Sequence, residues 1–429
     1  MKKTLLWLAA VVLGGTLLSC SSSKDEEMGS EKLLVTMLSE PQPIQLTAAQ
    51  KVFVNDNNSF TLNFLKTVNE ADHSGKSFVY SPLSITYVLG MVNDASTGMT
   101  EQELEQTLGF HEGGIQAVND YCKKLIEGLP LVDKDVQLNI ANALFVNKNK
   151  VRLKPQYQAD MEQYYDAKAE ALEFNSQALG KINDWCSDKT NGMIDKILDR
   201  IDPRVVTYLL NAIYFKADWT SKFDPDNTKT ETFTTENGST QLPLMQQDVL
   251  ISYAKTDTYA AIKLPYSNGY WDMTVMLPEE GKTIDDVISQ LTTEVMAGST
   301  TKPQFMAYEV DLKLPRFETY SDTDDLQAGL IGLLQKMGIR QAFEPNHAEI
   351  PNMCENTNVY IAMMRQKAAI KVNEEGAEAA AVTVAGGYAT SVGPVTYPKA
   401  TFHANRPFVY VIREASSNVI LFVGRFTGV

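Results

Sequence analysis

Hydrophobic residues follow helical spacing in several stretches of the chain. Phe60, Phe64 and Val68 recur every four residues and predict an amphipathic first helix. Thr100 is followed three residues later by Glu103, a pattern typical of a capping box, so we expect a helix that opens there and runs through residue 108. Two further helices are predicted at residues 84–92 and 182–197.

Short apolar runs predict strands between and after these helices. They lie at residues 78–80, 138–145, 206–215, 273–277, 408–412 and 419–425. The last two flank the turn-forming residues 415–418 and predict an antiparallel hairpin. The helices come mostly first and the strands mostly later, without an internal repeat or a long linker. This order indicates an α+β fold with one large core, spanning residues 48–429.

The first 20 residues follow a different pattern. Lys2 and Lys3 precede an apolar run at residues 5–13, which predicts a secretory signal rather than a permanent membrane span. The segment ends in LLSC, which resembles the lipobox of bacterial lipoproteins, so residues 1–20 are predicted to be a lipoprotein signal peptide and Cys20 to carry lipid. An ordinary secretory signal that contains a cysteine is the alternative. Polar residues 21–47 predict a tether, and we expect an anchor in the bacterial outer membrane, at the surface or in the periplasm.

Charge and motif content exclude several functions. The 429 residues include 38 Lys+Arg and 53 Asp+Glu, a net charge of −15, without a dense basic run, so we expect no nucleic-acid partner. Only 4 His are present and no catalytic or metal-binding motif occurs, so we expect no metal, no cofactor and no enzymatic activity. Apart from Cys20, three widely spaced cysteines remain, Cys122, Cys186 and Cys354, which allow at most one disulfide and a free thiol.

The stretch between Gly376 and Pro398 is small and nearly uncharged. It contains no Lys, Arg, His or Asp, and Glu378 is its only charged residue. With the two-residue period of a strand, one face reads Ala377, Ala379, Ala381, Thr383, Ala385 and Gly387, and the other reads Gly376, Glu378, Ala380, Val382, Val384 and Gly386. Such a segment could enter the middle of a sheet without overpacking, and twelve residues at about 3.3 Å each would span about 40 Å. A flexible surface loop with accidental alternation is the alternative.

Eight short motifs, in order along the chain, resemble those of the serpin family of protease inhibitors. They are FVYSPLSI at 78–85, ASTGMT at 95–100, NAIYFK at 211–216, LPY at 264–266, LPRF at 314–317, NEEGAEAAA at 373–381, NRPF at 405–408 and LFVGR at 421–425. Each motif alone is weak, but their ordered recurrence from about residue 48 to the end is specific. The resemblance implies a serpin fold: a large mixed and antiparallel sheet with covering helices and an exposed reactive-centre loop at about residues 374–400.

The resemblance also implies inhibition by a suicide mechanism. A protease attacks the loop as a substrate and forms an acyl-enzyme, and the cleaved loop inserts into the sheet before the complex can hydrolyse. We therefore expect a monomer whose partner is a protease in a covalent complex. The implied hinge residues are Glu374, Gly376, Ala377, Ala379, Ala380 and Ala381. The implied gate residues are Ser81, Ser84, Asn211, Gln366, Trp219 and Arg316, the last paired with Glu374.

Gln366 departs from the family pattern, because serpins usually have His at this position, ten residues before Gly376. An amide does not titrate near neutral pH, so a gate built on Gln366 should not respond to pH. Without the resemblance, Ser81 and Ser84 would be interpreted as turn and helix-cap residues, and Trp219 as a core residue. Glu374 and Glu375 would then be solvated surface rather than half of an ion pair.

The cleaved bond is predicted from its distance to the hinge. In the family it lies about fourteen residues beyond the hinge glycine, which corresponds to Thr390–Ser391 here. The loop looks a few residues longer than usual, so Tyr388, Ala389 and Val392 are alternatives. Because Lys and Arg are absent near the site, we expect elastase-like serine proteases as targets, with chymotrypsin-like or papain-like cysteine proteases second.

Two rival functions come from other classes of protein. A non-inhibitory binding protein with the serpin fold usually has a large or charged residue or Pro in its hinge, whereas residues 376–381 show no such block. A hydrolase would need a nucleophile beside a base, and His73, His111, His347 and His403 stand in no recognisable triad motif.

Overall fold

The computed structural model describes residues 40–297, 304–376 and 396–429. Its helices are α1 (Ala48–Ala71), α2 (Pro82–Asp94), α3 (Gly98–Leu108), α4 (Gly114–Gly128), α5 (Pro155–Tyr165), α6 (Ser176–Lys189), α7 (Ile284–Gln290), α8 (Thr293–Ala297) and α9 (Gly329–Met337). Its strands are β1 (Phe78–Tyr80), β2 (Gln137–Asn147), β3 (Lys168–Leu172), β4 (Thr207–Lys216), β5 (Lys229–Thr235), β6 (Gly238–Lys255), β7 (Tyr259–Tyr266), β8 (Trp271–Pro278), β9 (Met306–Pro315), β10 (Phe317–Asp322), β11 (Met364–Val372), β12 (Lys399–His403), β13 (Phe408–Glu414) and β14 (Ile420–Phe426).

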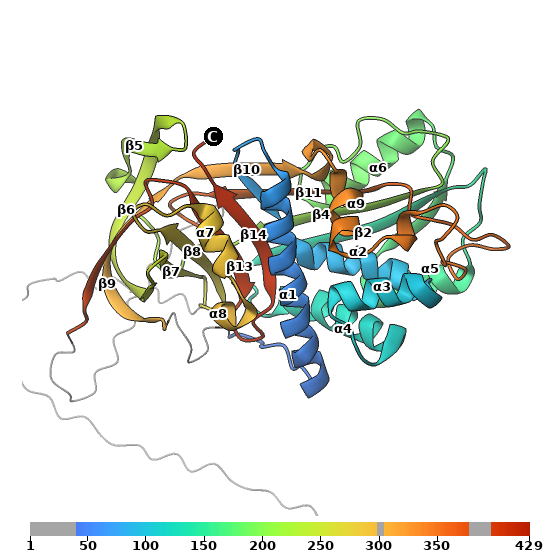
Figure 1. Ribbon diagram of the computed structural model, residues 1–429, viewed down its shortest axis with the longest axis horizontal. Helices are drawn as coiled ribbons and strands as arrows, with labels where there is room; N and C mark the ends of the chain where they lie inside the picture. Colours follow the sequence, from blue (N-terminus) through green and yellow to red (C-terminus); the bar gives the residue numbers. More distant parts are fainter. Residues whose placement is uncertain (1–39, 298–303, 377–395) are drawn as a thin grey trace, which may run out of the picture. The chain divides into compact units, whose positions relative to one another are not determined.

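The strands form two sheets, which confirms the predicted α+β class with a large mixed sheet. One sheet has 9 strands in the order β1-β14-β13-β8-β7-β6-β9-β12, with β5 paired to β6. The other has 5 strands in the order β10-β11-β4-β2-β3 and combines parallel and antiparallel pairs. The predicted hairpin is confirmed, because β13 and β14 are antiparallel neighbours. Figure 1 shows α1 crossing the nine-stranded sheet near β14, and α3, α4 and α5 gathered around α2.

Strand β4, in the middle of the five-stranded sheet, is buried on both faces, and the alternation of its side chains explains why. Leu209 and Ile213 belong to the main core shared with α2, whereas Tyr208, Leu210 and Ala212 belong to a second core that includes residues of α6. Successive side chains of a strand point to opposite faces, so one apolar run supplies both cores. This burial accounts for the nearly continuous apolar sequence at residues 206–215.

Two helix predictions need correction. The helix predicted at residues 182–197 ends at Lys189, because Asn191 and Gly192 have positive φ angles of 51° and 75°. Ile194 and Ile197 are nevertheless buried in the second core, so their apolar spacing imitated a longer helix. The apolar spacing that predicted a helix up to residue 197 therefore came from burial in the tertiary structure and not from a continuous helix.

The predicted capping box at Thr100 is also wrong. Helix α3 already begins at Gly98, and Thr100 Oγ1 accepts a hydrogen bond from Glu349 N at 2.9 Å. Glu103 Oε2 instead accepts hydrogen bonds from the backbone N–H groups of Arg340 and Gln341 at 2.7 and 2.8 Å. Both side chains therefore hold distant loops rather than the helix end.

The remaining cysteines are buried free thiols. Burial raises the pKa of Cys186 to about 12 and that of Cys354 to about 11, and it also raises the pKa of Cys122. All three thiols are therefore protonated at neutral pH. Across residues 40–297, 304–376 and 396–429, no helix is long and apolar enough to span a bilayer, and no cluster of His, Cys, Asp or Glu is placed to hold a metal ion.

Candidate functional site

The boundary between β4 and β11 is paired along only part of its length. The two strands run parallel, and their register ends at the pair Ala368–Ile213. Both strands continue, β4 to Lys216 and β11 to Val372, and each keeps its other neighbour to the end. The last residues of β4 and β11 therefore present edges that face each other without a ladder between them.

The chain reverses direction directly after β11. Asn373 N donates to Gly376 O at 3.0 Å, and Gly376 N donates to Asn373 O at 3.2 Å, which closes a tight turn. A strand that continued back along β11 from this turn would run antiparallel to β11. Because β4 is parallel to β11, the same segment would also be antiparallel to β4.

Gly376 is required by the geometry of this turn. Its φ angle is +131°, a conformation that residues with a side chain rarely adopt. A Cβ atom there would lie 2.3 Å from Ala217 O and 2.5 Å from Trp219 N. These contacts are backbone atoms that cannot rotate away, so no side chain fits at this position.

Glu374 is held beside the turn and is only 5% exposed. Its Oε1 accepts hydrogen bonds from the Arg316 guanidinium and, at 2.6 Å, from the Thr228 hydroxyl. Burial disfavours the charged carboxylate, but these hydrogen bonds outweigh it and hold the pKa of Glu374 below its usual value. The structure thus brings together the predicted pair Glu374 and Arg316.

Trp219 fastens the turn to the nine-stranded sheet. Its Nε1 donates to Asn373 O at 2.9 Å, and its backbone N donates to Glu375 O at 2.8 Å. Its ring stacks on Tyr266 of β7, with the ring centroids 4.3 Å apart. Trp219 is therefore a core residue that also contacts the predicted hinge.

Gln366 lies at the centre of the paired half of the boundary and is completely buried. Its Nε2 donates to Ser81 O and to Asn211 Oδ1, both at 2.9 Å, and its Oε1 accepts from Ser81 N at 3.0 Å. Ser81 is the N-cap of α2, and its Oγ lies 3.2 Å from Ser84 Oγ. A single amide therefore links α2, β4 and β11.

The same network continues into β2. Asn211 Nδ2 donates at 2.9 Å to Oδ1 of Asn142, which lies directly opposite on β2. Every side chain in this chain of contacts is a neutral amide or hydroxyl. The structure brings the predicted residues Ser81, Ser84, Asn211 and Gln366 together, and their role as a gate stays a prediction.

The other predicted site residues lie outside the described residues. They are the hinge residues Ala377, Ala379, Ala380 and Ala381, the reactive-bond residues Thr390 and Ser391 with the alternatives Tyr388, Ala389 and Val392, and the lipidation site Cys20.

Sequence reasoning missed several residues of the two groups of contacts, the one around Gln366 and the one around the turn at residues 373–376. Asn142 interrupts an apolar strand, and a buried amide in such a run needs a polar partner, so this residue could have been found. Thr323, which accepts from Gln366 N at 3.0 Å, and Thr228 have no comparable signal. They are ordinary threonines until the fold places them beside their partners.

Comparisons with known proteins agree with this architecture. The family model described as serpin (serine protease inhibitor) matches residues 55–428. The chain belongs to the serpin family. Serpin B8 of Bos taurus is 31% identical over 378 residues, covering 86% of this chain and 98% of that protein. An uncharacterized serpin-like protein of Thermococcus kodakarensis is 30% identical, covering 88% and 85%.

Solved serpin structures confirm the predicted fold. The thermophilic serpin tengpin in its native state has a TM-score of 0.78 and 25% identity, covering 92% of this chain and 98% of tengpin. Human thyroxine-binding globulin in complex with thyroxine has a TM-score of 0.75 and 26% identity, covering 88% of this chain and 98% of the globulin.

The charge and motif content led us to expect only that the protein has no enzymatic activity. The family match corrects this expectation. The family is described as serine protease inhibitors, which act on proteases without being catalytic themselves. The charge and motif content alone did not lead to this family description.

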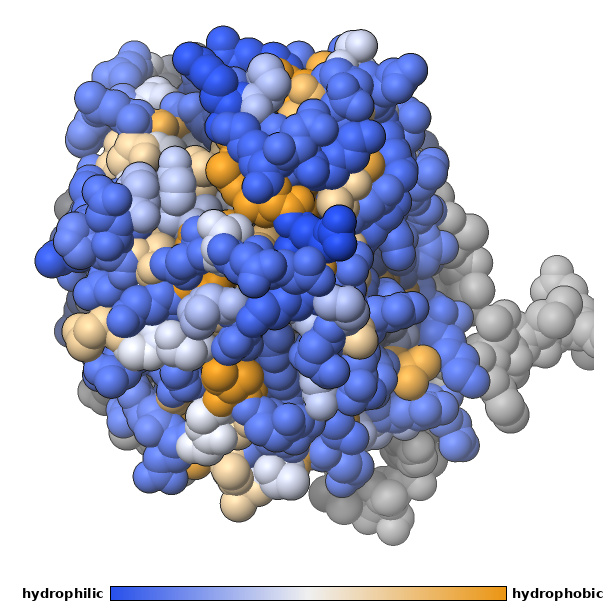
Figure 2. Space-filling view, turned by 90° about the vertical axis from the view of Figure 1, so that its right-hand side faces the viewer, coloured by the Kyte–Doolittle hydropathy of each residue, from blue (hydrophilic) through white to orange (hydrophobic). Residues whose placement is uncertain are grey.

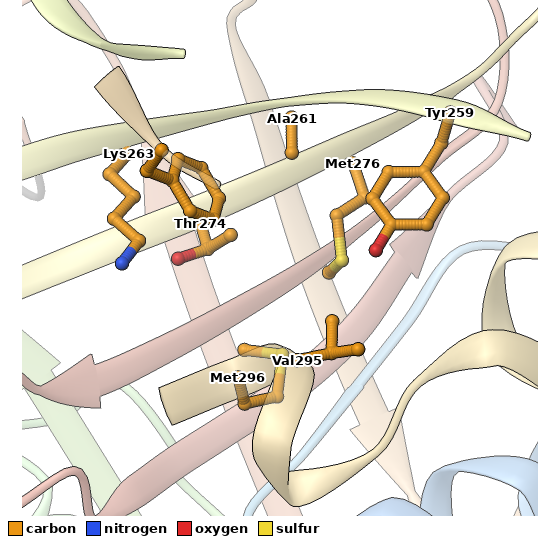
Figure 3. A pocket seen from close by; sticks show the side chains of 8 residues that line it. Tyr259, Ala261, Lys263, Thr274, Met276, Val295 and Met296 are labelled. Atoms are coloured by element: carbon orange, nitrogen blue, oxygen red, sulfur yellow. The ribbon is translucent and has the colours of Figure 1, made fainter. Parts of the chain in front are cut away.

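A small pocket between β7, β8 and α8 offers little room for a carried ligand. Figure 3 shows Tyr259, Lys263, Met276 and Met296 around it. Its volume is about 10 Å³, roughly the space of one water molecule. Burial, with the nearby charge of Arg413, lowers the pKa of Lys263 to about 8. In this structure the pocket has no space for a small organic molecule.

Proposed function

We propose that this serpin is a suicide-substrate inhibitor whose cleaved loop inserts between β4 and β11. The observation that carries this proposal is the end of the β4–β11 boundary beyond the pair Ala368–Ile213. There the two strands face each other without pairing, directly beside the turn that leads into the loop. The small-residue face that starts at Ala377 suits a strand that must pass between two buried layers.

Insertion is favourable because it replaces one short parallel ladder with two antiparallel ones. Antiparallel pairing is slightly more stable per residue than parallel pairing, and each net hydrogen bond contributes about 1 kcal/mol. The native state withholds these bonds at the last residues of β4 and β11. Loop insertion would therefore release free energy that can distort an attached protease.

The proposed chemistry is acyl transfer to the protease. The serine hydroxyl of the protease attacks the carbonyl carbon of Thr390, an ester forms, and the amine of Ser391 leaves with a proton. Insertion then moves the ester-linked protease away before water attacks the ester. Tyr388, Ala389 and Val392 are alternative cleavage positions.

We propose elastase-like serine proteases as the targets. Small side chains near the cleaved bond suit a shallow specificity pocket, and the absence of Lys and Arg leaves a trypsin-like pocket without its ion-pair partner. Chymotrypsin-like and papain-like cysteine proteases are the second choice.

We further propose that two clusters keep the sheet closed until cleavage. Ser81, Ser84, Asn211 and Gln366 would hold the paired half, where one buried amide spans α2, β4 and β11. Trp219 and the Arg316–Glu374 pair would hold the hinge turn, supported by their direct contacts with residues 373–375.

The proposed location is the bacterial outer membrane, through a lipid on Cys20, with the inhibitor domain on the cell surface or in the periplasm. We propose that it acts as a monomer. Figure 2 supports this on one side of the molecule, where apolar residues form small separate groups within a hydrophilic surface. Monomeric proteins rarely expose broad apolar patches, and permanent subunit contacts usually need one.

The central test is reaction with a pancreatic elastase. A complex that survives boiling in detergent is expected, and mass spectrometry of the released C-terminal fragment should place the new N-terminus at Ser391. Loop-cleaved protein should also unfold at a much higher temperature than intact protein. A cleaved protein with unchanged thermal stability and a released, active protease would contradict the proposal, and it would favour a binding protein of the same fold.

A matched pair of loop variants separates insertion from simple cleavage. Ala377→Arg puts a long cation on the face that must be buried, so it should convert the inhibitor into a substrate. Glu378→Arg makes the same addition on the opposite face and should leave complex formation largely intact. A stable covalent complex with Ala377→Arg would exclude the insertion step.

A further inference from the structure

Residues 193–199, which follow α6 and are called the strap below, are attached to the α6 side of the five-stranded sheet. Ile194, Ile197 and Leu198 are buried in the second core, which they share with residues of α6, β2 and β4. Asn183 of α6 holds the same segment through hydrogen bonds. Its Oδ1 accepts from the backbone N–H groups of Ile197 and Leu198 at 3.0 and 2.9 Å, and its Nδ2 donates to Leu198 O at 2.8 Å.

The strap is also attached to β11. Arg365 and Lys367 alternate with Gln366 along this strand, so their side chains lie on the face of the sheet that carries α6. Lys367 donates from Nζ to the backbone carbonyl of Lys196 at 2.8 Å, and Arg365 donates from Nη2 to Asp199 Oδ2 at 3.4 Å. The Asp199 side chain is 74% exposed, so solvent reaches this second attachment.

The strap therefore crosses the boundary between β4 and β11. In the strand order of the sheet, β4 and β2 lie on one side of this boundary and β11 lies on the other. Lys367 stands opposite Ala212 of β4 in the register of the two strands, so the crossing lies over the paired part of the boundary. A strand that enters between β4 and β11 along their full length has to pass beneath the strap.

The strap cannot keep both attachments while a strand enters. One added strand widens the distance between β4 and β11 by about 4.8 Å, the spacing of neighbouring strands. Hydrogen bonds of 2.8 to 3.4 Å do not survive such a displacement, so one side of the strap has to release. The α6 side combines buried apolar side chains with the Asn183 hydrogen bonds, whereas the β11 side ends on a backbone carbonyl and an exposed carboxylate. Exposed ion pairs contribute little, so we expect release from β11.

We propose that Lys367 and Arg365 set the rate of loop insertion by holding the strap, and thereby decide whether an attacking protease is trapped or released. The inference rests on the proposed function, in which insertion competes with hydrolysis of the acyl-enzyme. Asp322 of β10 positions both side chains: Arg365 Nε donates to its Oδ1 at 2.8 Å, and Lys367 Nζ lies 3.4 Å from its Oδ2. The two cations are thus fixed to β10 and β11 independently of the strap, which can detach from them.

Rapid-quench kinetics with pancreatic elastase tests this proposal. The full-length protein is mixed in excess with the protease, and the detergent-stable complex and the free cleaved inhibitor are measured over time. Lys367→Met removes the hydrogen bond to the strap, so the complex should form about threefold faster, with less cleaved inhibitor per trapped elastase. Lys367→Arg keeps a charged donor and should restore most of the slower rate. Lys189→Met, at an exposed lysine in the last turn of α6, should behave like the parent.

Asn183→Ala tests which side of the strap releases. The variant leaves the backbone N–H groups of Ile197 and Leu198 without their acceptor, so it should unfold at lower urea concentration than the parent. Its insertion rate should stay within about twofold of the parent rate, because the apolar side chains still hold the strap to α6.

The outcomes separate this inference from the proposed function. If the parent forms the stable complex and Lys367→Met forms it no faster, the strap does not control insertion, and only this inference fails. If Asn183→Ala forms the complex faster than Lys367→Met, the strap releases from α6, and the assignment to β11 is wrong. If the parent is cleaved and leaves no stable complex, the proposed function fails, and this inference fails with it.

Discussion

The two halves of the β4–β11 boundary are closed in different ways. In the lower half, five residue pairs form a continuous parallel ladder, and a buried network of neutral amides and hydroxyls crosses it. In the upper half the ladder between β4 and β11 is absent, and among the described residues the strands are joined through the turn at residues 373–376, where Trp219 and the Arg316–Glu374 pair make contact. The lower half is thus neutral and buried, whereas the upper half contains an ion pair between the buried Glu374 and the half-exposed Arg316.

This difference suggests a division of roles for an inserting strand. In the proposed mechanism, a strand that starts at the hinge would meet the open upper half first, where no ladder has to be broken. It would then reach the neutral network, which would have to separate before insertion could continue. Buried neutral hydrogen bonds are insensitive to salt and to pH near neutrality, whereas a partly exposed ion pair is screened by salt. The two halves should therefore respond to different perturbations.

The largest effect is expected from Gly376→Ala in the upper half. The added Cβ would collide with Ala217 O and Trp219 N, and the positive φ angle adds backbone strain. We expect a loss of more than about 3 kcal/mol, measured as an earlier urea or thermal unfolding transition. Gly192→Ala is the matched control, because Gly192 has a φ angle of +75° but open space around it. It should cost only about 1 kcal/mol, and equal losses in the two variants would contradict the steric argument.

Gln366→Leu should have the next largest effect, because it breaks the lower half. The change leaves the backbone N–H and C=O of Ser81 and the side-chain oxygen of Asn211 buried without their partner. We expect a loss of about 2–3 kcal/mol in urea unfolding and faster loop insertion on cleavage by elastase. Gln163→Leu, an exposed glutamine on α5, should change stability by less than about 0.5 kcal/mol. A stable Gln366→Leu protein would show that the amide network does not close the sheet.

Gln366→His should give the lower half a pH response that it lacks. Burial disfavours the imidazolium, so the pKa of His in the folded state should lie below its unfolded value of about 6.5. The unfolded chain then binds the proton more readily, and the variant should lose stability as pH falls below about 6.5. Thermal unfolding at several pH values between 8 and 5 measures this loss relative to the parent. If the unfolding temperatures of the variant and the parent changed equally with pH, the histidine side chain at position 366 would not be fully buried.

Glu374→Gln should have the smallest effect, and it should appear mainly in acid. The pKa of Glu374 is lowered in the folded state, so its contribution is present above the usual carboxyl range and is lost as pH falls below about 4.3. The variant should lack this acid-dependent loss, and at neutral pH it should cost about 1 kcal/mol or less, because Arg316 is half-exposed. Unfolding curves of parent and variant from pH 7 to pH 3 make the comparison. An unchanged acid profile would show that this pair does not help to hold the hinge.

Sequence patterns were most reliable where a single element determines them. The apolar runs of β4, β13 and β14 were found because burial on one or both faces leaves a regular signal along the chain. The end of α6 and the start of α3 were wrong, because Ile194, Ile197, Thr100 and Glu103 serve distant contacts that imitate local signals. A short stretch of sequence cannot distinguish these two origins.

The amino-acid sequence by itself determined the class of fold, the resemblance to the serpin family and the position of the small, nearly uncharged segment after Gly376. The fold class and the segment follow from composition and spacing, and the resemblance follows from short motifs in a fixed order, all of which are properties of the linear chain. Only the tertiary structure decided that Gln366 contacts Ser81 across 285 positions, that Glu374 meets Arg316, and that β4 and β11 part above Ala368. Hydrogen-bond partners and ladder ends depend on how distant segments pack, and the physics of that packing leaves no periodic trace in the sequence.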